Sequence, residues 1–362
     1  MDKQTVVVLF GGRSSEHSIS SATAGGVLAA IDRDRYQVIP VGITREGAFV
    51  LEEDRPEKFA LDAANLPLVS DNGTRVRWPE PGGDRMLRVA APDGSTVDLG
   101  EIDVVLPLLH GLHGEDGAIQ GFLDVIDVPY AGAGILDSAV CLDKHFTKLA
   151  LSAAGIAVAP GVTIRQTEWD ADPESVRARV AELGDVVFVK PVDAGSSVGV
   201  TRVDGGEGLD DALRVAFDES DKVLVETKIS GREIEVGVLD GRDGARARAS
   251  LPGEVVLTSR SFYDFEGKYL GGDGVEIVCP ASVDDALISR LQEAAVRAFE
   301  AVDGRGLARV DFFVTPDGDL IVNELNTMPG FTPISMFPKC WIASGLSYSD
   351  LITELIETGL RR

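Results

Sequence analysis

The sequence predicts an α/β fold divided into two or three domains. Its 362 residues are too many for one small hydrophobic core. In the N-terminal third, apolar strands alternate with helical segments, which is the pattern of parallel βαβ units. Farther along, shorter strands and amphipathic helices surround a polar hairpin at residues 308–326.

Composition narrows the class of protein. Hydrophobic residues make up 44% of the chain, which is ordinary for a soluble globular protein. A net charge of −25 argues against nucleic acid or an anionic membrane as a partner, although a metal ion and a few lysines can still bind phosphate locally. Cys141, Cys279 and Cys340 lack metal-like spacing, which predicts reduced thiols and a cytoplasmic enzyme. We expect no signal peptide and no membrane-spanning segment.

The first expected strand, Thr5 to Phe10, runs into the glycine turn GGRSSEH at residues 11–17. A helix is expected from Ile19 to Ile31. A strand, a glycine turn and a helix N-terminus together suit an anion or another ligand, although the spacing is not that of the dinucleotide fingerprint. Glu16 either interacts with the helix dipole or binds a substrate ammonium group, and the motif alone favours the dipole.

A second strand is expected from Tyr36 to Ile43, followed by an insertion at residues 45–100 that is rich in proline, glycine and charge. The insertion contains strand-like pieces at 75–78 and 86–90, and we assign it no chemistry.

Another apolar strand, Ile102 to Leu109, delivers the loop HGLHGEDG at residues 110–117, before a helix at 118–126. Ligands bind at such loops in open α/β sheets. A zinc site of His110, His113 and Glu115 is an alternative, disfavoured because the two histidines lack helical i,i+4 spacing.

The middle of the chain carries a candidate phosphate loop. One helix is expected at 136–154, with Lys144 on it, and strands at 162–163 and 186–190 flank an acidic helix at 173–183. Lys190 ends a strand and precedes DAGSSVGV at 193–200. Glycine permits close backbone approach, and serine and N–H groups donate to phosphate oxygens. The alternative is a plain hairpin turn, but the two lysines favour a phosphate site.

A candidate lid follows two further strands, at 222–226 and around Glu233 and Glu235. Residues 261–274, SFYDFEGKYLGGDG, combine aromatic residues with four glycines, which is typical of lids, and Lys268 and Tyr269 are its reactive candidates. An irregular surface loop is the alternative. A helix is expected from Ser282, as N-cap, to Val302, and a final one at 348–358.

The polar hairpin is expected to pair strands 308–314 and 320–326 through the turn TPDG. Side chains alternate along a strand. Arg309 and Asp311 therefore share one face, as do Glu324 and Asn326. The opposite, apolar face is expected to carry the remaining side chains: Val310, Phe312, Val314, Ile321 and Leu325.

Three oxygen donors on one face, Asp311, Glu324 and Asn326, suit Mg²⁺, with other positions left to water and phosphate. Arg309 beside them would stabilise developing negative charge. An exposed face with a salt bridge is the alternative. Four polar groups at this spacing, followed by Thr-Met-Pro-Gly, favour a metal–nucleotide site.

Several segments together resemble the D-alanine–D-alanine ligases of the ATP-grasp superfamily, and their order and spacing make the resemblance specific. It covers most of the chain outside residues 45–100. The segments are GGRSSEHSIS, HGLHGEDGAIQG, LDKHFTK, VKPVDAGSSVGV, SGREIEVGVL, YDFEGKYL, RVDFF and NELNTMPGFTPISM.

The resemblance implies a parallel-sheet preATP-grasp domain at 1–135, then a two-lobed ATP-grasp fold of α+β type. The central lobe, 136–226, would hold the phosphate loop, and the C-terminal lobe, 227–362, the lid and the Mg²⁺ site. It also implies a reaction in which ATP phosphorylates one D-alanine, the amine of a second attacks the acyl phosphate, and a tetrahedral intermediate collapses to the dipeptide. The implied partners are ATP, two D-alanines, two Mg²⁺ ions (or Mn²⁺), an optional monovalent cation and a second subunit in a homodimer.

The resemblance also assigns residues by motif position. It implies catalytic roles for Glu16, Ser196, Tyr269, Arg309 and Gly330. D-Alanine binding falls to Glu16, His110, Ser335 and Met336. Nucleotide binding falls to Lys144, Lys190, Ser196, Ser197, Glu226, Ile229, Glu233 and Lys268, and metal binding to Asp311, Glu324 and Asn326.

The resemblance further implies that Tyr269, with Ser196 and Glu16 as partners, favours the dipeptide over D-alanyl-D-lactate. One departure is Lys228, where many relatives carry an aromatic residue, which affects adenine packing. The competing interpretations are another ATP-grasp ligase and a non-catalytic nucleotide-binding relative. The Lys-Tyr pair and Ser335 argue against the first, and retention of Arg309 and the metal ligands argues against the second.

Overall fold

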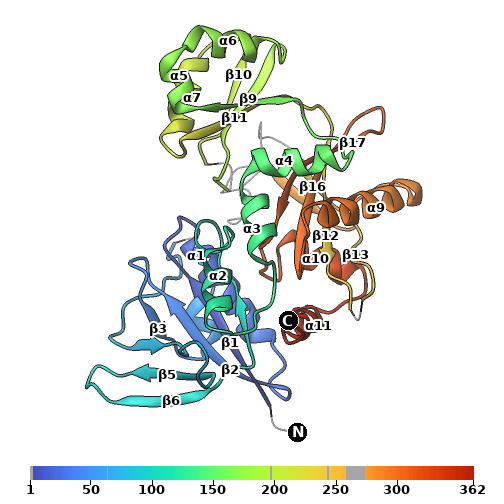
Figure 1. Cartoon of the computed structure of the whole chain (residues 1–362). Coiled ribbons are helices and arrows are strands. Elements are labelled where there is room, and N and C mark those ends of the chain that lie inside the picture. The colour runs from blue at the N-terminus through green and yellow to red at the C-terminus, as the bar shows by residue number, and fades with distance from the viewer. Residues whose placement is uncertain (1–2, 63, 196–197, 243, 258–273) are drawn as a thin grey trace.

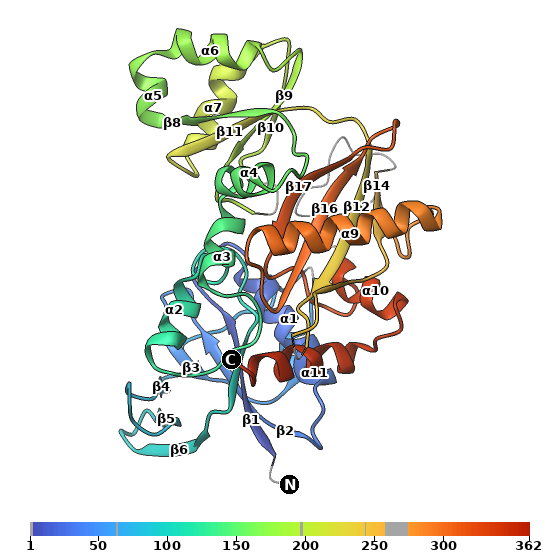
Figure 2. The same cartoon turned by 45° about the vertical axis from the view of Figure 1, so that its right-hand side comes forward.

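The computed structural model describes residues 3–62, 64–195, 198–242, 244–257 and 274–362. Figures 1 and 2 show three bodies: the N-terminal sheet at the bottom, a smaller sheet at the top and the C-terminal sheet between them at the side. Helices α3 (Ile135–Leu142) and α4 (Lys144–Ala153) run between the lower and upper bodies.

The N-terminal sheet has the order β3-β2-β1-β7. Strands β1 (Gln4–Gly11), β2 (Tyr36–Ile43) and β7 (Val104–Pro107) are parallel, as the βαβ pattern predicts, and β3 (Phe49–Leu51) is antiparallel to β2. Every residue of β7 is buried, and β1 is buried from Thr5 onward, because helices cover both faces. Helix α1 (His17–Ala30) packs on one face and α2 (Ala118–Val125) on the other.

The insertion forms its own small antiparallel sheet with the order β4-β5-β6. Its strands are β4 (Arg75–Arg77), β5 (Met86–Ala90) and β6 (Thr96–Glu101), and a 3₁₀ helix precedes them at Pro56–Phe59. Val76 and Leu87 bury their side chains in the cluster that also contains Leu9 and Val105, so the insertion extends the N-terminal core.

The upper body is an antiparallel sheet with the order β10-β9-β11-β8. One apolar cluster joins it to its helices. The strands are β8 (Gly161–Arg165), β9 (Val186–Pro191), β10 (Thr201–Asp204) and β11 (Lys222–Thr227), and the helices are α5 (Gln166–Ala171), α6 (Pro173–Ala181) and α7 (Leu209–Phe217).

The C-terminal sheet has the order β15-β14-β12-β16-β17, with β13 paired to β12. Helix α9 (Asp285–Ala301) packs on one face, and α10 (Met336–Ala343) packs on the other face at Gly237. The strands are β12 (Arg232–Leu239), β13 (Arg248–Ala249), β14 (Gly253–Leu257), β15 (Val275–Val278), β16 (Leu307–Val314) and β17 (Leu320–Asn326).

Three sequence expectations about elements are wrong. The helix expected at 136–154 is two helices, because Asp143 is extended and its carboxylate accepts hydrogen bonds from the N–H groups of His145 and Phe146, which starts α4. Asp284, not Ser282, caps α9. The strand expected at 102–109 spans only 104–107.

The expectation for Ile321 is also wrong. The register shifts by one residue after the Asp311–Glu324 pair, so Phe312 lies opposite Val322 and Phe313 opposite Ile321. This bulge reverses the alternation along β17. Val322 therefore joins Leu325 in the apolar cluster, and Ile321 lies outside it.

The last helix, α11 (Tyr348–Gly359), completes the N-terminal core rather than the C-terminal one. Four of its buried side chains pack in the cluster that contains Val6 and Phe10 of β1. Figure 2 shows this helix beside α1. The four are Leu351, Ile352, Leu355 and Ile356.

We expect Leu351→Ala to lower the free energy of unfolding by about 2–5 kcal/mol, because it removes a fully buried side chain and leaves a cavity. Urea unfolding of the full chain measures the change. Val125, 70% exposed, provides the control: Val125→Ala should change stability by about 0.5 kcal/mol or less. A similarly small loss for Leu351→Ala would mean that α11 contributes little to the core.

Candidate functional site

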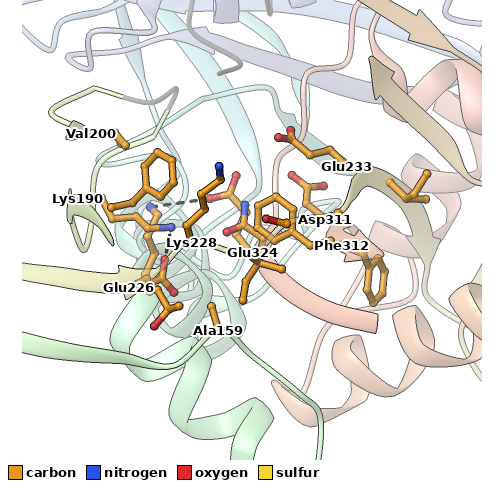
Figure 3. Close-up of a pocket in the computed structure, with 18 of the residues that line it drawn as sticks. Ala159, Lys190, Val200, Glu226, Lys228, Glu233, Asp311, Phe312 and Glu324 are labelled. Carbon is orange, nitrogen blue, oxygen red and sulfur yellow. Dashed lines mark ion pairs between the residues drawn. The ribbon is translucent and has the colours of Figure 1, made fainter. Parts of the chain in front are cut away.

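A cavity of about 440 Å³ lies between the upper and C-terminal sheets (Figure 3). This volume is in the range of pockets that hold small organic ligands. Strands β9 and β11 line one side with Phe188, Lys190 and Glu226, and strands β12, β16 and β17 line the other with acidic side chains. Of the residues predicted to bind nucleotide, five line this cavity: Lys144, Lys190, Glu226, Ile229 and Glu233.

Glu226 joins two lysines at one end of this cavity. Its two carboxylate oxygens form ion pairs with Lys148 of α4 and Lys190 of β9. Burial opposes ionisation of Glu226, but the two lysines lower the pKa of the carboxyl group below its usual value. Burial also lowers the pKa of Lys148, against the attraction of Glu226. Lys148 was not among the predicted site residues, because nothing in the local sequence reveals Glu226 as its partner.

Lys144 lies where the cavity meets the loop expected to bind phosphate. Its Nζ donates to the carbonyl oxygen of Ala194 at 2.7 Å and lies 4.0 Å from Oε2 of Glu324. The ammonium group of Lys144 therefore lies between the glycine loop and the acidic strands.

The polar faces of β16 and β17 meet as predicted, because Arg309 lies opposite Asn326 and Asp311 opposite Glu324. The Arg309 guanidinium donates to both oxygens of Asp311, from Nε at 2.7 Å and from an Nη at 2.6 Å. Its Nε also lies 2.8 Å from Oε2 of Glu235, which is on β12 directly opposite Asp311 of β16. Burial disfavours the charged guanidinium, but these carboxylates raise the pKa of Arg309 well above its usual value.

The oxygen donors on this face fit a divalent cation. Asp311, Glu324 and the amide of Asn326 come from adjacent strands, and Asn326 Nδ2 lies 3.1 Å from Asp311 Oδ2. Two carboxylates directly opposite each other on neighbouring strands repel. A hard cation between them would offset that repulsion with the ligand type it prefers.

A second cavity of about 70 Å³ adjoins the first, and three residues line both: Gly195, Glu235 and Glu324. Its volume limits an occupant to a small molecule. The walls bring together all parts of the predicted amino-acid site that the structure describes, which are Glu16, His110, Arg309, Gly330, Ser335 and Met336.

Glu16 is buried at the N-cap position, immediately before α1. Two glycines from other loops approach its carboxylate. A Cβ atom at Gly111 would lie 3.2 Å from Oε2, and one at Gly195 would lie 3.4 Å from it. The first motif of the chain and the phosphate loop therefore meet at one carboxylate.

The zinc alternative is wrong. The ring nitrogens of His110 are engaged, with Nδ1 3.0 Å from the Met328 carbonyl oxygen and Nε2 3.3 Å from Thr23 Oγ1, whereas His113 is exposed. Burial lowers the pKa of His110. In the part of the chain that the structure describes, no three His, Cys, Asp or Glu residues gather as metal ligands.

Glu115 is a site residue that was predicted only as a ligand of the alternative zinc site. Its carboxylate accepts hydrogen bonds from the N–H groups of Gly111 and, at 3.2 Å, Met328, so it ties the loop after β7 to the loop after β17. Desolvation, and after it the charge of Glu16, raise the pKa of Glu115 to about 8. Glu235 was also missed. The alternation of polar and apolar residues along its strand predicted only a polar side chain and did not indicate a partner in the site.

Four predicted site residues lie outside the described residues: Ser196, Ser197, Lys268 and Tyr269. Their roles stay predictions. None of the helices that the structure describes has the length and apolar character needed to cross a membrane.

The D-ala D-ala ligase N-terminus family model matches residues 5–133, and the D-ala D-ala ligase C-terminus model matches residues 150–357. The chain is 51% identical to a D-alanine--D-alanine ligase of Arthrobacter sp. (strain FB24), over 99% of this chain and 95% of that one. Two solved structures are each 33% identical to it. The D-alanine-D-alanine ligase from Coxiella burnetii has a TM-score of 0.83, covering 100% of this chain and 95% of that one. The VanG D-Ala:D-Ser ligase from Enterococcus faecalis has a TM-score of 0.84, covering 99% of this chain and 99% of that one.

The fold, a parallel N-terminal sheet followed by two antiparallel sheets with a cavity between them, defines the ATP-grasp class, as predicted. Within that class, the chain belongs to the D-alanine–D-alanine ligase family. The resemblance found in the sequence motifs is therefore confirmed.

Glu115 should make the folded protein less stable as the pH rises from about 5 to 8. Its pKa is raised from 4.5 to about 8 on folding, so the folded state holds a proton that the unfolded chain has released. The stability contribution is full below the unfolded pKa and is lost as pH rises through the folded one. In Glu115→Ala, we expect Tm to depend less on pH between about 5 and 8 than in the wild type.

Differential scanning calorimetry without ligands measures these slopes. Asp127→Ala, which removes an exposed carboxylate, should keep the wild-type slope. An unchanged slope in Glu115→Ala would contradict the raised pKa.

Proposed function

We propose that this protein is an ATP-dependent ligase that joins two D-alanine molecules into D-alanyl-D-alanine, a peptidoglycan precursor. The observation that carries the proposal is the junction of the two cavities, because Gly195, Glu235 and Glu324 line both. The terminal phosphate of a nucleotide in the larger cavity would meet, at this junction, a carboxylate held in the smaller one. The name of the relatives at about 50% identity over the whole chain supports the same reaction.

The reaction has two steps. A carboxylate oxygen of the first D-alanine attacks the γ-phosphorus of ATP, which gives D-alanyl phosphate and ADP. The amine of the second D-alanine, having lost a proton, attacks the carbonyl carbon, and the tetrahedral intermediate expels phosphate. Both steps concentrate negative charge on oxygens, so the protein contributes mainly positioning and charge stabilisation.

On the nucleotide side, Lys144 and Lys190 bind phosphate oxygens, and Glu226, Ile229 and Glu233 hold adenine and ribose. The position of Lys144 between Ala194 and Glu324 supports phosphates at the junction of the cavities. Ser196, Ser197 and Lys268 are assigned to the nucleotide by resemblance alone.

On the amino-acid side, Glu16 binds the ammonium group of the first D-alanine, which suits a buried carboxylate at the wall of the small cavity. Ser335, Met336 and His110 position the D-alanines. Arg309 and the N–H of Gly330 stabilise the oxyanion. Ser196 and Tyr269 are assigned catalytic roles by resemblance alone.

Two Mg²⁺ ions, or Mn²⁺, would be held by Asp311, Glu324 and Asn326, whose oxygens share one face of the sheet. When bound, the metal neutralises charge on the phosphate oxygens. Arg309 keeps Asp311 oriented through two hydrogen bonds.

By resemblance we also propose a cytoplasmic homodimer with no nucleic-acid or membrane partner, and an optional monovalent cation. The domain division at 1–135, 136–226 and 227–362 has the same basis. The packing of α11 on the N-terminal core means that the last segment reaches back across the first boundary.

The purified chain with ATP and Mg²⁺ should release phosphate when D-alanine is added and not with L-alanine. Mass spectrometry should identify D-alanyl-D-alanine. Adding D-serine or D-lactate beside D-alanine tests the second position, since one structural relative is a D-Ala:D-Ser ligase by name. Preferential formation of D-alanyl-D-serine or D-alanyl-D-lactate would contradict the assignment of D-alanine as the second substrate. Phosphate release only with another carboxylate would overturn both.

Arg309→Ala should lower kcat by about a hundredfold, equivalent to about 3 kcal/mol of barrier, with a much smaller effect on KM for ATP. The reason is that Arg309 acts on charge that develops during the reaction. Steady-state kinetics at saturating D-alanine measures both constants.

Arg246 is a matched control, because it also clamps two carboxylates, Glu293 and Glu300, but on an exposed surface. Arg246→Ala should leave kcat unchanged. Circular dichroism should verify that Arg309→Ala folds, and Arg309→Lys provides a second variant that keeps the charge. If both variants of Arg309 changed only KM for ATP, the oxyanion role would be wrong.

A further inference from the structure

Two of the three cysteines are in contact although they are far apart in sequence. Cys279 follows β15, Cys340 lies in α10, and their Sγ atoms are 3.6 Å apart. Both belong to a small apolar cluster at the edge of the C-terminal sheet, together with Val255, Ile277 and Met336. Both are free thiols.

The two thiols differ in reactivity. Cys279 is half-buried and Cys340 is buried. Contact with the Cys340 thiol lowers the pKa of Cys279, and the positive charge of Lys339 lowers it further against the effect of burial. The same contact and burial raise the pKa of Cys340. One thiol is therefore suited to attack an oxidant as the thiolate, and the other lies within reach to resolve the product.

We propose that Cys279 and Cys340 form a redox-sensitive modification site, which a peroxide oxidises to a disulfide and which alters the small cavity. The Cys279 thiolate attacks one oxygen of hydrogen peroxide. The O–O bond breaks, one water leaves after protonation, and Cys279 becomes a sulfenic acid. The Cys340 thiol then displaces the second oxygen as water and forms the S–S bond. The two sulfurs give up two electrons, which the peroxide accepts.

The site is adjacent to the small cavity through its own elements. Ile277 lies two residues before Cys279, Met336 lies one helical turn before Cys340, and both line that cavity. An S–S bond of about 2.05 Å must bring the sulfurs roughly 1.5 Å closer than the observed contact.

Tight packing around α10 limits how that movement is absorbed. A Cβ atom at Gly253 would lie 2.2 Å from Sδ of Met336 and 3.0 Å from Sγ of Cys340. Cys340 Sγ also lies 4.0 Å from the carbonyl oxygen of Glu235, a residue that lines both cavities. Of the two cavities, Ile277 and Met336 line only the small one, so we expect the disulfide to shift that cavity more than the nucleotide end. This coupling rests on the proposed function, whereas the disulfide does not.

The first test is chemical. The full chain is treated with hydrogen peroxide, alkylated in denaturant and analysed by peptide mass. We expect a linked peptide pair containing Cys279 and Cys340, two hydrogens lighter than the reduced pair and restored by dithiothreitol. Cys141→Ser should keep the link, since Cys141 lies in a different cluster, and Cys279→Ser and Cys340→Ser should each lose it. Full alkylation of both thiols, or a sulfinic acid on Cys279 without the link, would overturn the site.

The second test is kinetic. In the oxidised wild type, KM for D-alanine should rise at least threefold while KM for ATP changes less than twofold. Peroxide-treated Cys279→Ser should keep its untreated constants. If the link forms and KM for D-alanine is unchanged, the coupling is wrong and the redox site stands. If the reduced protein makes no dipeptide, the proposed function and the coupling fail together, and the mass measurement still decides the disulfide.

Discussion

The guanidinium of Arg309, held between Asp311 and Glu235, is the interaction on which the site depends. Three neighbouring strands present carboxylates on one face, with Glu235 opposite Asp311 and Asp311 opposite Glu324. The carboxylates on this face repel one another unless positive charges lie between them. Arg309 supplies one positive charge from β16 itself, and Lys144 of α4 supplies a second, 4.0 Å from Glu324. The carboxylate oxygens can then face the cavities.

The two cavities lie between bodies of the fold because each is lined by residues from more than one of them. The larger cavity needs β9 and β11 of the upper sheet to bring Lys190 and Glu226 opposite the acidic strands. The smaller cavity needs the loops after β1 and β7, which carry Glu16 and Glu115. The core cluster that α11 shares with the N-terminal sheet joins the last part of the chain to the first. The geometry of the small cavity therefore depends on packing far from it.

Patterns of neighbouring residues predicted many of the elements correctly. They failed where a residue distant in the sequence determines the local structure. The strands of the N-terminal sheet and the polar hairpin were predicted because burial and alternation leave direct marks in sequence. The helix break at Asp143 was missed, since the apolar pattern runs through it, whereas the Asp143 side chain caps α4 and pairs with Lys222 across the fold. The bulge that moved Ile321 out of the core follows from cross-strand pairing, which one strand cannot reveal.

The sequence by itself determined the family, the two strands of the polar hairpin and the shared face of Arg309, Asp311, Glu324 and Asn326. These depend on residue type and on periods of two or 3.6 residues, which are local properties. Only the tertiary structure decided that Glu115 bridges two loops, that Lys148 shares Glu226 with Lys190, and that Cys279 meets Cys340. Each of these contacts joins segments far apart in the chain, and burial and packing of the whole molecule set the distance between them.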